Sequence, residues 1–302
     1  MSQSTALKFI FFGEDIFSLV ILKSLVESNL NLKPICVVML EPIALSGQRL
    51  VDYCAEQSIP LLKTKSVKSN EFLANFDELK FDLTISAHFQ RILPEVLFGR
   101  AALGGLNLHP SLLPRYRGMS PQHWPIILGD DQTGVTVHLI DEGVDTGNIL
   151  CQETISLSND IYIHELQKKF LVIYKTIMVD AVKKLMLGER GYTQPAIDLP
   201  YFGKIKEEDM VISFDMGVDK AYGMIRAFSF PYQGACFKNL RIMKAARIGN
   251  DIIAEIKMST AAVGLYEDKK SKYLILQDGV LEILKWKKYE RKNYRNNIFT
   301  PS

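Results

Sequence analysis

Residue types that suit acyl transfer gather between residues 105 and 147. In the stretch Leu-Asn-Leu-His, Asn107 and His109 alternate with leucines. On a β-strand such residues point to the same face, about 6–7 Å apart. A later apolar run leads into a loop that carries Asp141, Glu142 and Asp145. An Asn amide donates to an oxyanion, a His moves a proton, and an Asp orients the His, so the set predicts acyl transfer to an amine.

Each of these residues also has an ordinary structural interpretation. Asn107 can cap the loop that follows it, and Asp141 or Asp145 can simply stabilise a turn. His138, which stands between apolar residues, is typical of a partly buried histidine in a sheet. Only the combination of residues favours the catalytic interpretation.

The sequence does not carry the motifs of several other common sites. Gly13 stands alone in the first strand–helix turn, in place of G-x-G-x-x-G, and Glu14 and Asp15 beside it would repel a pyrophosphate. A dinucleotide cofactor is therefore disfavoured. Neither a P-loop nor G-x-S-x-G occurs. The histidines and cysteines lack the spacing of metal ligands, so no metal is expected.

Alternation of apolar runs with helical stretches predicts an open, doubly wound, Rossmann-like α/β sheet. Runs that are apolar on both faces are typical of strands buried between helical layers. Such runs occupy residues 7–12, 32–39, 81–86, 104–108, 135–140 and 149–157. A long amphipathic helix is expected over residues 161–187. Ligands bind at the carboxyl ends of the strands in such sheets, where residues 107 and 109 would lie.

The composition changes after residue 187. Residues 188–203 hold three glycines and two prolines and show no helical period. We therefore predict a catalytic domain over residues 1–190, a linker over 191–203, and a smaller, mainly β, OB-like domain over 204–302. Its expected elements are a helix at 218–229, strands at 235–243, 252–258, 272–277 and 280–286, and a hairpin turn at 277–279.

Charge and composition narrow the function further. The 302 residues have a formal net charge of +2, which argues against a large nucleic-acid-binding field. The four cysteines are far apart and form no C-x-x-C pair, which predicts reduced thiols in the cytoplasm. The sequence shows neither the pattern of a signal peptide nor an apolar run long enough to span a membrane. A cytoplasmic protein without membrane contact is therefore expected.

Two segments together resemble a known family. The segments NLHPSLLPRYRGMSP and TGVTVHLIDEGVDTG resemble the signature of the formyltransferases that use N10-formyltetrahydrofolate. The resemblance extends to YFGKIKEED and MIRAFSFPYQGA in the second domain, and so covers nearly the whole chain. It implies a catalytic triad of Asn107, His109 and Asp145. In the implied mechanism Asn107 and protonated His109 stabilise the oxyanion, and the His109–Asp145 pair handles the proton.

The resemblance also implies a slot for the pterin ring of N10-formyltetrahydrofolate, with no metal. The segments that match the family's slot are residues 87–94 and 140–145. Its residues would be Phe89, Gln90, Ile92, Leu93, Ile140, Asp141 and Gly143. The apolar ones among them equally suit a plain core.

Three branches of the family formylate different amines: initiator methionyl-tRNA, glycinamide ribonucleotide and nucleotide-linked amino sugars. The glycinamide enzyme resembles the first domain alone. The tRNA enzymes carry a basic, glycine-rich loop after the second strand, whereas Arg49 is the one basic residue of residues 39–54 here. This favours a nucleotide-linked amino sugar, a 4-amino-4,6-dideoxyhexose destined for surface polysaccharide such as the lipopolysaccharide O-antigen. Methionyl-tRNA is the alternative, and a non-catalytic folate- or nucleotide-binding module is a more remote one.

Aromatic and basic side chains near the motif suit a nucleotide, because a ring stacks on a base and an arginine pairs with a diphosphate. The candidates are Ser111, Arg115, Tyr116, Arg117, Trp124 and Tyr222. The aromatic ones equally suit a core. A nucleic-acid partner is not expected. The sugar branch is commonly dimeric, and apolar strands in the second domain agree with a homodimer.

Overall fold

The computed structural model describes residues 5–259, 263–268 and 270–289. The chain divides into two compact units. The first comprises residues 5–122, 132–156 and 167–204, and the second residues 123–131, 157–166 and the described part from 205 onward. The predicted fold class is confirmed: the first unit is α/β, and the second carries a separate antiparallel sheet.

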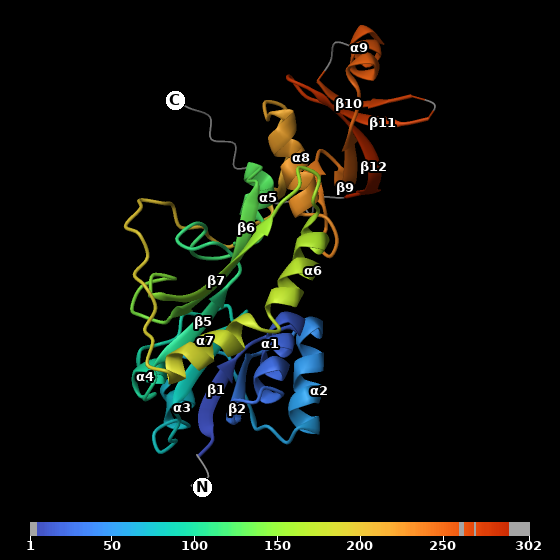
Figure 1. Ribbon diagram of the computed structural model, residues 1–302. Coiled ribbons are helices and arrows are strands. Elements are labelled where there is room, and N and C mark those ends of the chain that lie inside the picture. Colours follow the sequence, from blue (N-terminus) through green and yellow to red (C-terminus); the bar gives the residue numbers. More distant parts are fainter. Residues whose placement is uncertain (1–4, 260–262, 269, 290–302) are drawn as a thin grey trace, which may run out of the picture. The chain divides into compact units, whose positions relative to one another are not determined.

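The first unit is built on a seven-stranded sheet (Figure 1). Its strand order is β3-β2-β1-β4-β5-β6-β7. The strands are β1 (Leu7–Phe12), β2 (Leu32–Leu40), β3 (Leu61–Thr64), β4 (Leu83–Ala87), β5 (Gly105–His109), β6 (Gln132–Leu139) and β7 (Ile149–Ser156). The first five run parallel, β6 is antiparallel to β5, and β7 is antiparallel to β6. The carboxyl ends of β1, β4 and β5 therefore share one edge of the sheet.

Helices connect these strands. They are α1 (Ile16–Val26), η1 (Leu45–Gly47), α2 (Gln48–Glu56), α3 (Asn70–Ala74), α4 (Val96–Gly99), α6 (Ile163–Ile173), which runs from the second unit into the first, and α7 (Ile177–Met186). Asp15 caps α1 in a capping box with Ser18. The single long helix predicted over residues 161–187 is wrong. The chain turns between α6 and α7, where the Thr176 hydroxyl donates to the Ile173 carbonyl and competes with the helical hydrogen bonds.

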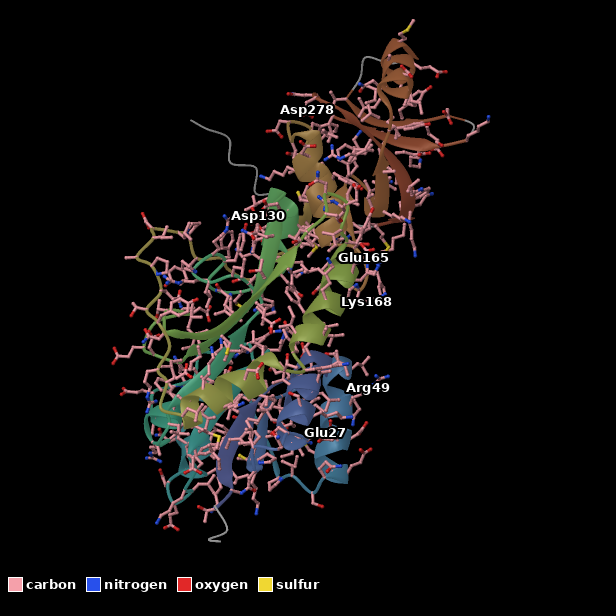
Figure 2. The ribbon with its side chains drawn as sticks, in the orientation of Figure 1. Glu27, Arg49, Asp130, Glu165, Lys168 and Asp278 are labelled. Carbon is pink, nitrogen blue, oxygen red and sulfur yellow. The ribbon has the colours of Figure 1, made fainter. Side chains whose placement is uncertain are left out.

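The second unit carries a five-stranded antiparallel sheet in the order β10-β11-β12-β9-β8. Its elements are α5 (Trp124–Leu128), η2 (Glu208–Met210), α8 (Val218–Ala227), β8 (Ala235–Phe237), β9 (Leu240–Arg247), α9 (Asn250–Ser259), β10 (Gly264–Glu267), β11 (Lys272–Ile275) and β12 (Val280–Lys288). The predicted hairpin lies between β11 and β12, where the Leu276 N–H donates to the Gly279 carbonyl at 2.9 Å. From the same turn Asp278 accepts from the Val218 N–H at 2.8 Å (Figure 2). The OB-like barrel stays a prediction.

The strand predicted at residues 252–258 is wrong, because this stretch forms α9. Ile252, Ile253 and Ile256 follow a helical period among good helix formers. Ile256 is 5% exposed and packs with Tyr273 in the core of the second unit. Apolar residues on one face of a short run do not by themselves separate a helix from a strand.

Candidate active site

The structure brings Asn107, His109 and Asp145 together. Asn107 and His109 lie on β5, and Asp145 lies in the loop between β6 and β7. The Asn107 amide donates to Asp145 Oδ1 at 3.3 Å, and His109 Nδ1 lies 3.5 Å from Asp145 Oδ2. Residues far apart in the sequence thus form one cluster. Their catalytic role stays a prediction at this stage.

The antiparallel turn of β6 delivers Asp145 to this cluster. Leu139 pairs with Leu106, so β6 ends beside the start of β5 rather than at its carboxyl end. The loop must then turn back to bring Asp145 to the far end of β5. Asp145 has a φ of +55°, a conformation that costs free energy for a residue with a side chain. Gly147 allows the return, since a Cβ there would stand 1.9 Å from the Leu139 carbonyl oxygen.

The Asp145 carboxylate is held in its charged form. Its side chain is 13% exposed, and Oδ2 accepts from the Gly118 N–H at 2.9 Å. Burial would raise the pKa of Asp145, but His109, His138 and the Gly118 N–H together hold it below its ordinary value. Asp145 is therefore an anion across the neutral pH range, with two imidazoles beside it.

His109 is buried between two acceptors. Its side chain is 5% exposed, and Nε2 lies 2.8 Å from the Tyr116 carbonyl oxygen, so Nε2 carries a proton. Burial lowers the pKa of His109, and the Asp145 carboxylate and the Tyr116 carbonyl act in the opposite direction without overcoming it. Burial thus disfavours the charged ring, although each ring nitrogen faces an oxygen acceptor. The protonated ring that the resemblance implies stays a prediction.

His138 belongs to the same cluster. It pairs with Asn107 in the β5–β6 register and is 3% exposed. Its Nδ1 donates to the Leu139 carbonyl at 2.7 Å, which leaves Nε2 to accept from the Asn107 amide at 3.1 Å. Nε2 also lies 3.4 Å from Asp145 Oδ1. Sequence reasoning favoured a structural role for His138, and its flanking apolar residues gave no sign of these polar contacts.

Sequence reasoning also missed Gln194. This residue lies in the predicted linker, yet its side chain is buried and bonds to the loop that carries Asp145. A stretch without periodicity offers no pattern from which such a contact can be read. The order of the flanking prolines and glycines indicated only irregular backbone.

The two segments predicted to hold the pterin pack against one hydrophobic cluster of the first unit. Phe89, after β4, and Ile140, after β6, pack against the same hydrophobic cluster. Phe89 contacts Phe12 edge to face, with ring centroids 5.3 Å apart. Leu93 is buried within that cluster, whereas Ile92 is 60% exposed. Packing of both segments against the same cluster agrees with one shared slot, and the ligand role of these residues stays a prediction.

The polar members of the predicted slot have protein partners. The backbone N–H of Gln90 donates to Glu14 Oε2 at 3.2 Å. Asp141 Oδ1 accepts from the Gly143 N–H at 3.2 Å and from the Thr146 hydroxyl at 2.7 Å. Asp141 and Gly143 therefore form a tight exposed turn before Asp145.

The predicted substrate residues of the first unit lie in the loop after β5. Ser111 is buried and donates to the Arg115 carbonyl at 2.7 Å. The Arg115 guanidinium lies over the Tyr116 ring, 5.3 Å from its centroid. Arg117 donates to Gln194 Oε1 through Nη2 at 2.6 Å. These contacts give the loop a defined shape, and contact with a substrate stays a prediction.

Trp124 and Tyr222 belong to the second unit. Tyr222 is 4% exposed and donates to Asp160 Oδ1 at 3.0 Å. The guanidiniums of Arg226 and Arg247 lie 4.7 and 5.0 Å from its ring centroid. Burial raises the pKa of the Tyr222 hydroxyl far above its ordinary value. Tyr222 thus has a firm place in the second unit's packing, and stacking on a base stays a prediction for it and for Trp124.

Within the described residues, no group of three or more His, Cys, Asp or Glu side chains is arranged to hold a metal ion. A search of the same part of the chain finds no helix with the length and apolar character needed to cross a bilayer.

Residues 8–182 match the formyl transferase family. The methionyl-tRNA formyltransferase of Thermodesulfovibrio yellowstonii is 28% identical over 283 residues, which cover 91% of this chain and 89% of that protein.

Two solved structures share the fold. The crystal structure of WlaRD, a sugar 3N-formyl transferase, in the presence of dTDP and 5-N-formyl-THF is 18% identical and has a TM-score of 0.68. The match covers 93% of this chain and 98% of that one. The N-formyltransferase from Helicobacter canadensis, in complex with folinic acid and dTDP-3-aminofucose, is 19% identical with a TM-score of 0.69, and the match covers 92% and 98% of the two chains.

Proposed function

The chain belongs to the formyl transferase family, and we propose that it moves the formyl group of N10-formyltetrahydrofolate to the amine of a nucleotide-linked amino sugar. One observation carries the choice of acceptor. Between β2 and the body of α2, residues 39–54 contain a single cation, Arg49, which is exposed on α2 (Figure 2). Binding a tRNA through its phosphates calls for several cations, whereas a nucleoside diphosphate needs one or two.

The two structural neighbours support this acceptor. Both matches extend over more than nine-tenths of each chain, including the second unit, and both proteins are named or crystallised with a nucleotide sugar or its nucleotide. One is a sugar 3N-formyl transferase, and the other holds dTDP-3-aminofucose. The amine at C4 predicted from the sequence and an amine at C3 are therefore both acceptors to test. A homodimer, a cytoplasmic site and a product used in surface polysaccharide stay predictions.

The reaction follows from the cluster on β5. The neutral amine attacks the formyl carbon, a C–N bond forms, and the carbonyl electron pair moves to oxygen. Asn107 donates to that oxygen. Both amide hydrogens have acceptors in the resting cluster, Asp145 Oδ1 at 3.3 Å and His138 Nε2 at 3.1 Å, so one of these contacts must yield to the oxyanion.

His109 takes the proton that the attacking amine loses. The lowered pKa of His109 favours the neutral ring that can receive this proton, and the Asp145 anion stabilises the imidazolium that forms. When the bond between the formyl carbon and N10 breaks, the proton passes to N10, leaving a formamide and tetrahydrofolate. In the resting cluster Nε2 donates its hydrogen to the Tyr116 carbonyl. Catalysis therefore requires this carbonyl to move aside and the hydrogen to shift to Nδ1, where it faces Asp145 and leaves the Nε2 lone pair for the substrate.

A second candidate acceptor is initiator methionyl-tRNA. It is favoured by the similarity to the T. yellowstonii enzyme over 91% of the chain. The second unit also presents a lysine strip, which we define as the exposed side chains of Lys244 on β9 and Lys285, Lys287 and Lys288 on β12. Such a strip suits the phosphates of an RNA.

One experiment separates the acceptors. The full chain is incubated with N10-formyltetrahydrofolate and, in parallel, with dTDP-, UDP- and GDP-linked 3-amino and 4-amino 6-deoxyhexoses and with charged initiator tRNA. Mass spectrometry then detects an added formyl group. Formylation of one nucleotide sugar and none of the tRNA is expected. Formylation of the tRNA alone would overturn the proposal, and folinic acid binding without any transfer would indicate a non-catalytic binding module.

A further inference from the structure

Gln194 bonds to both loops that build the cluster. Its Nε2 donates to the Asp145 carbonyl at 2.9 Å and to the Gly147 carbonyl at 2.8 Å. Its Oε1 accepts from Arg117, through Nη2 at 2.6 Å and Nε at 3.3 Å. We infer that Gln194 is a positioning residue, which fixes the Asp145 main chain against the loop after β5 so that the carboxylate faces His109.

The side-chain amide is fully used in this arrangement. Both amide hydrogens point at carbonyl oxygens, and the amide oxygen faces only donors, since a guanidinium has no acceptor. The neighbouring donors and acceptors therefore fix which side of the amide carries the oxygen and which carries the nitrogen. Gln194 is 7% exposed, so water has little access to replace these bonds. A buried glutamine whose amide forms all of its hydrogen bonds is held in one conformation.

The backbone on both sides of Gln194 is also anchored. Tyr192 and Ile149 exchange two hydrogen bonds of 3.0 and 2.9 Å at the start of β7. Further along, the Phe202 N–H donates to the Arg117 carbonyl at 2.9 Å, and the Met119 N–H donates to the Phe202 carbonyl at 2.7 Å. We call residues 192–202 the strap. Its two ends are tied to the β7 side and the β5 side, with Gln194 between them.

The strained backbone conformation of the Asp145 loop explains why a positioning residue is needed. Asp145 sits at a φ of +55°, so the loop tends to relax unless neighbours hold it. Gln194 bonds to the carbonyl of Asp145 itself and to that of the glycine two residues on. It touches neither His109 nor any reacting atom, and acts on the reaction only through Asp145. The inference therefore rests on the proposed catalytic role of Asp145.

The first test needs no acceptor. The chain has five histidines, so ¹³C- or ¹⁵N-histidine labelling gives few signals, and His109 is assigned with His109→Gln. In Gln194→Met, which keeps the side chain's length but not its bonds, the carboxylate moves away and the pKa of His109 falls. Gln167→Met is the matched control, because Gln167 is also 7% exposed and its Nε2 donates to Gln122. Unchanged His109 titration in Gln194→Met overturns the inference.

Gln194→Leu is a second uncharged variant that removes the same hydrogen bonds, and it serves if Gln194→Met does not fold. The inference expects the pKa of His109 to fall in this variant as in Gln194→Met. A wild-type titration of His109 in Gln194→Leu would overturn the role at Asp145.

A double-mutant cycle adds a kinetic readout once an acceptor is known. Gln194→Met should lower kcat by about 10- to 100-fold, with KM for N10-formyltetrahydrofolate unchanged. In an Asp145→Asn background the same substitution should have no further effect, because the residue through which it acts is already lost. Full additivity would contradict the inference. If no acceptor is formylated, the proposed function fails while the titration result stands.

Discussion

At the scale of the residue, the cluster on β5 combines a permanent anion with two imidazoles in a site that hardly reaches water. Asp145 accepts from the Gly118 N–H and faces both His109 and His138. The low local dielectric strengthens these interactions and makes an unpaired member costly. The same desolvation lowers the pKa of His109 and so favours a neutral ring, which can take a proton beside a fixed carboxylate.

Asn107→Ala tests the donor to the oxyanion. Loss of the amide should lower kcat by about 10²–10³-fold, because the developing negative charge loses its donor. The measurement is steady-state kinetics with the acceptor identified above. Asn148→Ala is the control: Asn148 lies in the same loop as Asp145 but donates to the Arg190 carbonyl, so its loss should leave kcat unchanged. Equal rates in the two variants would remove Asn107 from the mechanism.

Asp145→Asn tests the stabilisation by the carboxylate as a function of pH. The folded pKa of Asp145 lies below the unfolded value of about 3.9, so the unfolded state binds more protons between the two. The carboxylate's contribution to the free energy of unfolding is thus fully present above pH ~4 and is lost as the pH falls through the folded pKa. Wild type should exceed Asp145→Asn in urea unfolding at pH 7, and the gap should narrow at pH 3. A gap independent of pH would contradict the assigned shift.

At the scale of the element, the loop after β5, the loop between β6 and β7 and the strap are joined by hydrogen bonds near the carboxyl end of β5. Four of the five parallel strands could be predicted because their apolar runs are continuous on both faces, and so could the placement of Asn107 and His109 on one face of β5. The strand β3 was not predicted, because its four residues, LLKT, include no such run. The reversal of β6 could not be predicted, since a buried strand has the same pattern in either direction. The strap lacked any period, so its contacts with Arg117 and Asp145 had no sequence pattern.

Gly118→Ala tests the close approach of the strap. A Cβ at Gly118 would stand 2.4 Å from the Phe202 carbonyl oxygen, at a φ of +99°. Gly188→Ala is the matched control, with a φ of +86° and open space around the Cβ. Both variants share the strain of a left-handed alanine, about 1–2 kcal/mol. Gly118→Ala should lose about 1–3 kcal/mol more in urea unfolding and lose activity as well. Equal losses would show that the strap has room to shift.

At the scale of the whole molecule, a near-neutral chain bears its exposed cations unevenly. The formal charge is +2, yet the lysine strip gathers four cations on the sheet of the second unit. The relatives similar in sequence and those similar in fold are named for different acceptors, and a tRNA would respond to these cations more strongly than a nucleotide sugar. Loss of charge should matter to a large polyanion and little to a nucleotide sugar.

The triple variant Lys285→Glu, Lys287→Glu, Lys288→Glu reverses most of the strip and changes the formal charge from +2 to −4, a change of two for each residue. We expect kcat/KM for the nucleotide sugar to stay within about twofold of wild type, with weak dependence on salt. A loss of tenfold or more, relieved by salt, would identify the strip as part of the acceptor site.

The position of the strap limits how this chain can be recombined. A graft that exchanges the C-terminal part at residue 190, where composition alone puts the border, would carry Gln194 and Phe202 away with the foreign piece. The chimaera would keep β5 and its polar side chains but would lose the strap residues that align them. Chimaeras of this chain should therefore be spliced beyond residue 204, and natural exchange of its tail faces the same restriction.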